Sequence, residues 1–125
     1  MSRTGGDSVA LVSVLAVGLG GAVGALSRYG VALSIERTRV DTLIVNVVGS
    51  FVFGVVFGLG IDGPALLALV VGFCGAFTTF STFAVETVQL TEDGEWVTVV
   101  IYAGGTLVVA LGAVLAGGWI ASSVW

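Results

Sequence analysis

Residues 72–83 read GFCGAFTTFSTF, a poor sequence for a continuous helix in the middle of an apolar segment. Glycine lacks the β-carbon that restricts other residues to helical dihedrals, and Thr and Ser hydroxyls compete for the backbone groups that a helix uses. We therefore expect the helix to break here. At depth in a bilayer, irregular backbone persists only where protein or a water-filled cavity satisfies its polar groups, so the break predicts a binding or transport site.

The composition predicts a membrane protein. Of 125 residues, 57% are hydrophobic and 10% are charged, and the chain has no lysine and no histidine. A soluble domain of this size needs more polar surface than that. The single cysteine, Cys74, excludes an internal disulfide and a cysteine-cluster metal site.

Acidic residues lie between or beside the apolar runs, and we expect them to be solvated loop charges. A high-salt environment is a second interpretation of this acidic surface. The residues concerned are Asp7, Asp41, Asp62, Glu92, Asp93 and Glu95.

Four apolar runs, at 9–26, 42–61, 64–85 and 96–120, are long enough to cross a bilayer. A hydrocarbon core about 30 Å thick needs ~20 apolar residues at ~1.5 Å rise each. We predict a single transmembrane domain, residues 1–125, with helices at about 9–33, 42–61, 64–89 and 96–121. A cleaved signal peptide is the alternative for the first run. Connections are expected near 34–41, 62–63 and 86–95, so that no Asp, Glu, Lys or His lies between the helix ends.

Glycine and proline positions predict how the helices pack. Residues 62–64, Asp-Gly-Pro, suit a sharp turn, so the second and third helices should form an antiparallel hairpin. Gly20 with Gly24, and Gly54 with Gly58, form pairs four residues apart that let helix backbones approach closely.

The arginines barely specify a membrane orientation. Arg3 lies on one side, Arg37 and Arg39 in the first loop on the other, and Arg28 near the end of the first helix. Insertion in both orientations, which would allow an antiparallel dimer, and one fixed orientation with weak signals both stay open. Four short helices enclose little space, so we expect an oligomer with its pathway between chains.

Polar side chains within the apolar runs are costly in lipid unless they have partners, and we expect them at a pathway or an interface. Thr42, Asn46 and Ser50 share one face of the second helix. The Asn46 amide could donate to a dehydrated anion, or it could bond to a neighbouring helix as a structural group. Arg28 could raise the anion concentration at a pore mouth, or extend toward the headgroups.

Two further pairs lie on single helix faces. Phe80 and Phe83 follow the expected break, where their positive ring edges could stabilise a small anion; packing and lipid contact are the alternative. On the fourth helix, Tyr102 and Thr106 form a hydroxyl track that Ala110 cannot continue. The chain has no histidine base, Walker lysine or metal-ligand cluster, so we expect neither an enzyme nor a nucleic-acid partner.

Three motifs resemble those of the Fluc (CrcB) family of fluoride channels. They are GGAVGALSRY at 20–29, TLIVNVVGSF at 42–51 and GFCGAFTTFSTF at 72–83, in the family's order and in a chain of family length. The resemblance implies an all-α membrane protein with four transmembrane helices, the third of them broken. It also implies an antiparallel, dual-topology homodimer with two pores in the cell membrane, each passing fluoride passively out of the cell.

The resemblance also assigns residues. Those that it places along the fluoride pore are Asn46, Phe80, Phe83, Thr42, Tyr102 and Thr106, with Arg28 at the pore mouth. Gly75 and Thr78 would break the third helix and offer backbone carbonyls to a structural sodium ion at the dimer interface. Ala110 departs from the pattern, because family members often carry serine there.

Three other functions stay open. The chain could be one subunit of a heterodimeric fluoride channel, paired with a paralogous subunit of opposite orientation. It could be a small dual-topology four-helix multidrug exporter, although such exporters rely on a membrane-embedded glutamate in the first helix, which this chain lacks. It could also be a packing subunit that transports nothing.

Overall fold

The computed structural model describes residues 3–35 and 38–124, and every regular element in these ranges is a helix. Four segments are long and apolar enough to cross a membrane: Gly5–Ser34, Arg39–Gly58, Gly63–Glu92 and Trp96–Val124. The chain is therefore a multi-pass integral membrane protein, and the predicted four-helix fold with a broken third helix is confirmed. Arg37 lies outside the described residues.

The third span is divided into several elements. In chain order the helices are α1 (Arg3–Ser34), α2 (Thr38–Gly58), α3 (Gly63–Leu66), the π-helix η1 (Leu67–Cys74), α4 (Gly75–Phe77), α5 (Phe80–Glu92) and α6 (Trp96–Val124). Several boundaries differ from the prediction. Because α1 begins at Arg3 and not near residue 9, Asp7 belongs to a helix and the prediction that it is a loop charge is wrong. Because α2 begins at Thr38, Arg39 and Asp41 belong to a helix instead of a loop, and because α5 continues to Glu92, Glu86 lies inside the third span.

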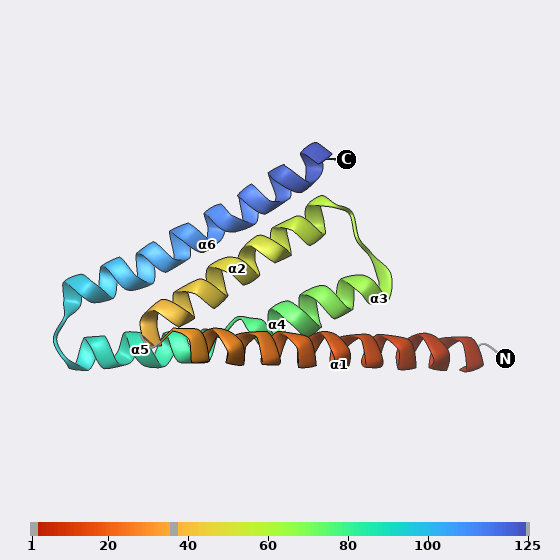
Figure 1. The fold of residues 1–125 in the computed structure, drawn as a ribbon, viewed down its shortest axis with the longest axis horizontal. Helices are drawn as coiled ribbons and strands as arrows, with labels where there is room; N and C mark the ends of the chain where they lie inside the picture. Colours follow the sequence, from red (N-terminus) through yellow and green to blue (C-terminus); the bar gives the residue numbers. More distant parts are fainter. Residues whose placement is uncertain (1–2, 36–37, 125) are drawn as a thin grey trace.

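The helices associate as two pairs. Figure 1 shows α2 beside α6, and α1 running along the first part of the third span, from α3 to α4. The second and third spans are antiparallel, as predicted, but α2 packs most extensively against α6, and η1 packs most extensively against α1. Positive φ angles at Gly60 and Gly63, 71° and 65°, turn the chain between the two pairs.

Close helix packing explains the glycine pairs. A β-carbon at Gly54 would collide with the Val114 carbonyl of α6, and one at Gly58 would lie 2.6 Å from the Gly118 carbonyl oxygen. Both contacts are too close for a β-carbon, so neither position can carry a side chain without moving the helices apart. The prediction that Gly54 and Gly58 permit close backbone approach is confirmed.

The pairing of α1 with the third span uses glycines from both helices. A β-carbon at Gly20 would collide with the Ala68 carbonyl, and one at Gly72 would lie 2.6 Å from the Val17 carbonyl oxygen. Gly72 is therefore needed for helix contact, not for the break that follows it. It lies within η1, where the wider π-helical turn leads into the break.

The break itself lies at two threonines. Thr78 has φ −81° and ψ 162°, and Thr79 has φ −145° and ψ 116°, so both are extended. Gly75 keeps helical angles of −61° and −37°. The prediction that Gly75 helps to break the helix is therefore wrong, whereas Thr78 does lie at the break. The reason is tertiary, because the groups that hold the break open belong to α2 and to the start of α5.

Much of the apolar surface faces outward. Only 6% of the most hydrophobic window of α1, and the same share for α6, is buried within the chain. Exposed apolar side chains cost nothing when they face lipid or a second protein chain. This distribution agrees with a chain that lies in a bilayer.

Candidate functional site

Asn46 braces the broken helix from α2. Its Oδ1 accepts a hydrogen bond from the backbone N–H of Thr79 at 2.8 Å, and its Nδ2 donates to the Thr79 carbonyl oxygen at 3.1 Å. One amide thus pairs both backbone groups of a residue that has left the helix. An unpaired backbone group at this depth would be costly. Of the two roles considered for Asn46, this contact matches the structural one, in which the amide bonds to another segment of the protein.

The same bonds release carbonyl oxygens. In a continuous helix, Thr79 N would donate to Gly75 O and Thr82 N would donate to Thr78 O. Instead, Thr79 N donates to Asn46, and Thr82 N donates to Thr79 Oγ1 at 3.2 Å. The carbonyls of Gly75 and Thr78 therefore lose their helical donors. These are the two oxygens that the resemblance assigned to a cation.

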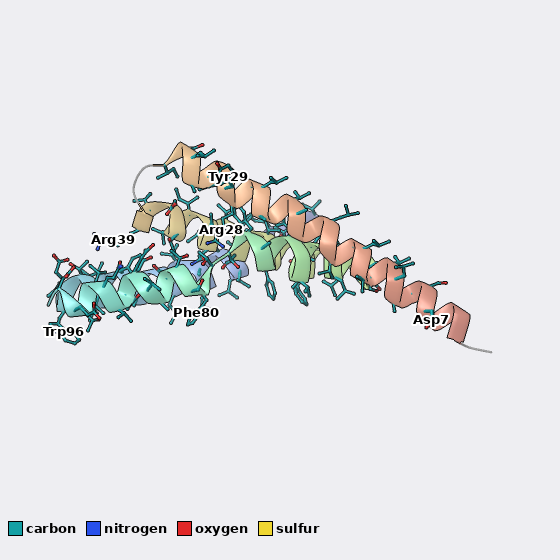
Figure 2. The ribbon with its side chains drawn as sticks, turned by 90° about the horizontal axis from the view of Figure 1, so that it is seen from below. Asp7, Arg28, Tyr29, Arg39, Phe80 and Trp96 are labelled. Atoms are coloured by element: carbon teal, nitrogen blue, oxygen red, sulfur yellow. The ribbon has the colours of Figure 1, made fainter. Side chains whose placement is uncertain are left out.

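A hydroxyl network caps the start of α5. Thr79 is the N-cap residue; its Oγ1 accepts from Thr82 N and donates to Thr82 Oγ1 at 3.0 Å. Arg28 of α1 donates from Nη2 to the same Thr82 oxygen at 3.3 Å. The half-buried Arg28 therefore points toward the break and not toward the headgroups, in the region seen in Figure 2.

A cavity of about 460 Å³ opens beside the break, between α2, α5 and α6. It brings together four of the residues that the sequence suggested for an ion path, namely Asn46, Phe80, Phe83 and Thr106. Thr78, Thr79 and Ser50 also line it. The helix N-terminus of α5 meets this cavity, and the N-terminal end of a helix carries partial positive charge.

The two phenylalanines present a large ring surface. Phe80 is 80% exposed, and its ring centroid lies 6.3 Å from that of Phe83, with 41° between the planes. Phe83 in turn lies 5.3 Å from the Tyr102 ring. Side chains three residues apart share a helix face, as the sequence predicted. Phe80 points outward, as Figure 2 shows, so a single chain leaves the cavity open on that side.

The polarity of the cavity changes along α6. Thr106 is only 7% exposed, and among the described residues no group accepts its hydroxyl proton, so this hydroxyl can donate into the cavity. The α6 residues around it, Ala103 one turn before, Leu107 next to it and Ala110 one turn after, present apolar surface. The Ser50 hydroxyl donates to the Asn46 carbonyl oxygen at 2.7 Å.

A second groove, of about 340 Å³, lies next to this cavity. Gly75 and Thr78 line it together with Gly49, Ser50, Phe53, Val70, Cys74 and Val114. Among the described residues no cluster of His, Cys, Asp and Glu could hold a metal ion. A cation at this place would therefore need backbone oxygens, and the two released carbonyls are chemically suited to a hard ion such as sodium.

The comparisons with known proteins agree with these motifs. The family model described as "CrcB-like protein, Camphor Resistance (CrcB)" matches residues 15–118, which is most of the chain. This chain belongs to the CrcB family. The cavity, the break and the Asn46 brace all lie within the part that matches the CrcB model.

Three similar proteins carry names that state a substrate. A CrcB relative from Natronomonas pharaonis, named fluoride-specific ion channel FluC 2, is 56% identical over 109 residues, covering 87% of this chain and 94% of the relative. One of the same name from Haloarcula marismortui is 48% identical over 105 residues, covering 82% and 88%. Fluoride-specific ion channel FluC from Nitratidesulfovibrio vulgaris is 41% identical over 108 residues, covering 78% and 87%.

One residue of this CrcB chain contradicts the sequence analysis. Glu86, assigned to a connection, is 6% exposed inside the third span. Its Oε1 accepts from Thr42 Oγ1 at 2.8 Å and its Oε2 accepts from the Tyr102 hydroxyl at 2.6 Å. The prediction that no acidic side chain lies between the helix ends is wrong, because two hydroxyls from α2 and α6 partner the carboxylate.

These bonds give Thr42 and Tyr102 a contact that the sequence analysis did not predict. Both were predicted along the ion path, yet the structure directs their hydroxyls to Glu86 and neither residue lines the cavity beside the break. A signal for Glu86 was present in the sequence, since it follows Phe80 and Phe83 at intervals of three. That spacing places it near the same face of α5.

We expect Glu86→Met to lower the melting temperature of the purified CrcB chain in detergent. The change keeps side-chain length but removes the carboxylate that accepts from the buried Thr42 hydroxyl and the half-buried Tyr102 hydroxyl, and each lost bond costs about 1–3 kcal/mol. Adding Thr42→Val and Tyr102→Phe removes both donors and should restore most of the loss. Glu92→Met, at the exposed end of the same helix, is the control. Equal melting temperatures for Glu86→Met and the control would contradict this account.

Proposed function

We propose that this protein is a fluoride-selective channel that passes the ion passively across the cell membrane and so reduces fluoride toxicity. The observation that carries the proposal is the cavity beside the break, where an amide, a free hydroxyl and two phenylalanine rings meet without a cation. These groups belong to Asn46, Thr106, Phe80 and Phe83. The fluoride-specific names of the similar proteins support the same substrate.

The cavity offers several weak attractions to an anion in place of one strong one. Asn46 Nδ2 carries a second N–H beyond the one bonded to Thr79 O, and Thr106 can donate its hydroxyl. The N-terminus of α5 adds a partial positive charge, and the rings of Phe80 and Phe83 can present positive edges. Conduction requires binding that is favourable enough for entry and weak enough for exit.

Glu86 has a different role in this proposal. Because both carboxylate oxygens accept hydrogen bonds from hydroxyls, the negative charge is held between α2, α5 and α6, outside the cavity. A carboxylate held in this way would repel an anion less than one facing it. The same engagement argues against the multidrug-exporter alternative, in which a carboxylate must be open to a cationic substrate.

A second copy of the chain is proposed to complete the pathway. Phe80 is 80% exposed, and the cavity and the neighbouring groove at Gly75 both lie open on one side of the chain. We propose an antiparallel, dual-topology homodimer, with the weak arginine bias as support and a paralogous partner as the alternative. The carbonyls of Gly75 and Thr78 would hold a structural sodium ion, which would supply fixed positive charge between the copies. No catalytic role is proposed.

Fluoride efflux from liposomes containing the purified protein tests the proposal. We expect wild-type efflux to be fast and Phe80→Ile to reduce it at least ~10-fold, equal to an added barrier of about 1.4 kcal/mol, because isoleucine has no ring edge. Phe57→Ile, a change at an exposed ring of α2 outside the cavity, is the matched control.

The outcomes separate the remaining functions. An inactive wild-type protein would refute a self-sufficient channel and favour a packing subunit or a heterodimer. Wild-type efflux by Phe80→Ile would remove that ring from the pathway. Transport of a hydrophobic cation by a protein that shows no fluoride efflux would support the exporter.

A further inference from the structure

A third groove lies between α2 and α6; it shares Thr106 with the cavity beside the break, and its other lining residues lie outside that cavity. Its volume is about 400 Å³. One end carries Arg39 and Thr98, and the remainder is lined mainly by apolar atoms, including those of Leu43, Ile101 and Val109. The groove is thus polar at one end and apolar along its length.

The groove and the cavity lie on different faces of α6 and meet at Thr106. At about 100° per residue, the α6 residues that line the groove are centred roughly 120° around the helix from those that line the cavity. A second copy docked over the cavity would leave the groove uncovered. In a bilayer, this face of α2 and α6 therefore meets lipid.

The groove runs along α6, one of the four membrane-spanning segments. Thr98 and Val109 are separated by a helix rise of about 16 Å, close to the thickness of one leaflet of the hydrocarbon core. Trp96, which is 62% exposed, begins α6 next to the polar end. Tryptophan prefers the membrane interface. Figure 2 shows Arg39 and Trp96 at the same end of the molecule, opposite Asp7.

Gly105 is the residue that leaves room. It lies in the middle of the groove, and a β-carbon there would meet nothing within 4 Å. A longer side chain at this position would occupy the space between α2 and α6 without disturbing their packing. This contrasts with the glycines that are buried in helix contacts, such as Gly54.

We propose that this groove binds an anionic phospholipid, with one acyl chain along α6 and the phosphate held by Arg39 and Thr98. The exposed guanidinium of Arg39 matches phosphate geometry, and the Thr98 hydroxyl can donate beside it. Thr106 lines both this groove and the cavity, and Tyr102 lines the groove and bonds to Glu86. The bound chain therefore lies directly behind the proposed pathway.

Native mass spectrometry of the full chain, released from detergent with added lipid, tests this site. The probes are dioleoylphosphatidylglycerol and dioleoylphosphatidylcholine, which share acyl chains and differ in headgroup charge. We expect wild type to retain the anionic lipid about 5-fold more than the zwitterionic one. Arg39→Gln should abolish the preference and keep the weaker retention of both. Arg3→Gln, which removes an arginine at the first residue of α1, should leave the preference unchanged.

A steric pair tests the groove itself. Gly105→Leu should reduce retention of both lipids at least ~5-fold, because leucine fills the space for the acyl chain. Gly104→Leu adds the same side chain at a neighbouring open position that does not line the groove, and should behave as wild type. Equal retention of the two lipids by wild type, or unchanged retention in Gly105→Leu, overturns the proposal. So does a changed oligomeric mass in Gly105→Leu, which would mean that protein covers the groove.

Discussion

Asn46→Leu is expected to abolish most fluoride efflux and to destabilise the protein. Leucine matches asparagine in size but cannot pair with the Thr79 N–H and carbonyl, which Asn46 bonds at 2.8 and 3.1 Å. Each unpaired group costs about 1–3 kcal/mol, and the extended backbone at Thr79 loses its support. We expect efflux to fall at least ~100-fold, equivalent to about 2.7 kcal/mol in barrier height.

A matched control separates the brace from a general loss of polarity. Thr91→Val removes a hydroxyl that bonds only to the Thr87 carbonyl of its own helix, at 2.9 Å. Efflux from liposomes and melting in detergent should stay close to wild type in this variant. If Asn46→Leu matched it in both measurements, the brace would have no importance for the break or for conduction.

Gly75→Leu is expected to dissociate the proposed dimer while each copy of the chain stays folded. Within one chain, a β-carbon at Gly75 meets only the Val70 carbonyl oxygen, at 3.9 Å, and the residue lines an open groove. A loss of the dimer without a loss of folding would therefore place the effect at the contact with a second copy. We expect the dissociation constant of the dimer to rise at least ~10-fold, equal to about 1.4 kcal/mol, measured by light scattering on a size-exclusion column.

Two further variants complete this experiment. Gly112→Leu places the same side chain at an open position of α6, on the face away from the cavity, and should leave the dimer intact. Phe83→Leu should keep the dimer and lose conduction, because its ring lines the cavity. A dimer that is lost in Phe83→Leu and retained in Gly75→Leu would reverse the proposed division between assembly and conduction.

The four spans could be predicted because a bilayer requires long apolar runs, and these are local properties of the sequence. The existence of a break could also be predicted, from the glycines and hydroxyl residues of 72–83. Its place could be predicted only in part: Thr78 was expected there, but Thr79 leaves the helix because Asn46, 33 residues earlier, supplies the pairing groups. Gly75 stayed helical because nothing in its surroundings required otherwise.

Glu86 and Arg28 show the same limit for charged groups. A carboxylate in a bilayer is costly, so Glu86 was assigned to a connection on sequence grounds. Its two hydroxyl partners, on α2 and α6, become visible only in three dimensions. Arg28 was left between a pore mouth and the headgroups, and its bond to Thr82 directs it toward the break. The length of an apolar run can be read from consecutive residues, whereas the partner of a polar side chain can lie on a distant helix.

The brace between Asn46 and Thr79 has a consequence for the order of events during synthesis. The third span's own amide side chain, Gln89, lies ten residues after Thr79 on α5, so before the span meets α2 its backbone is best satisfied as an unbroken helix. The break would then form only when the inserted third span docks on α2. The kink is then a product of assembly within the membrane. In a truncated chain whose third span cannot dock on α2, we expect each span to cross the bilayer as an unbroken helix.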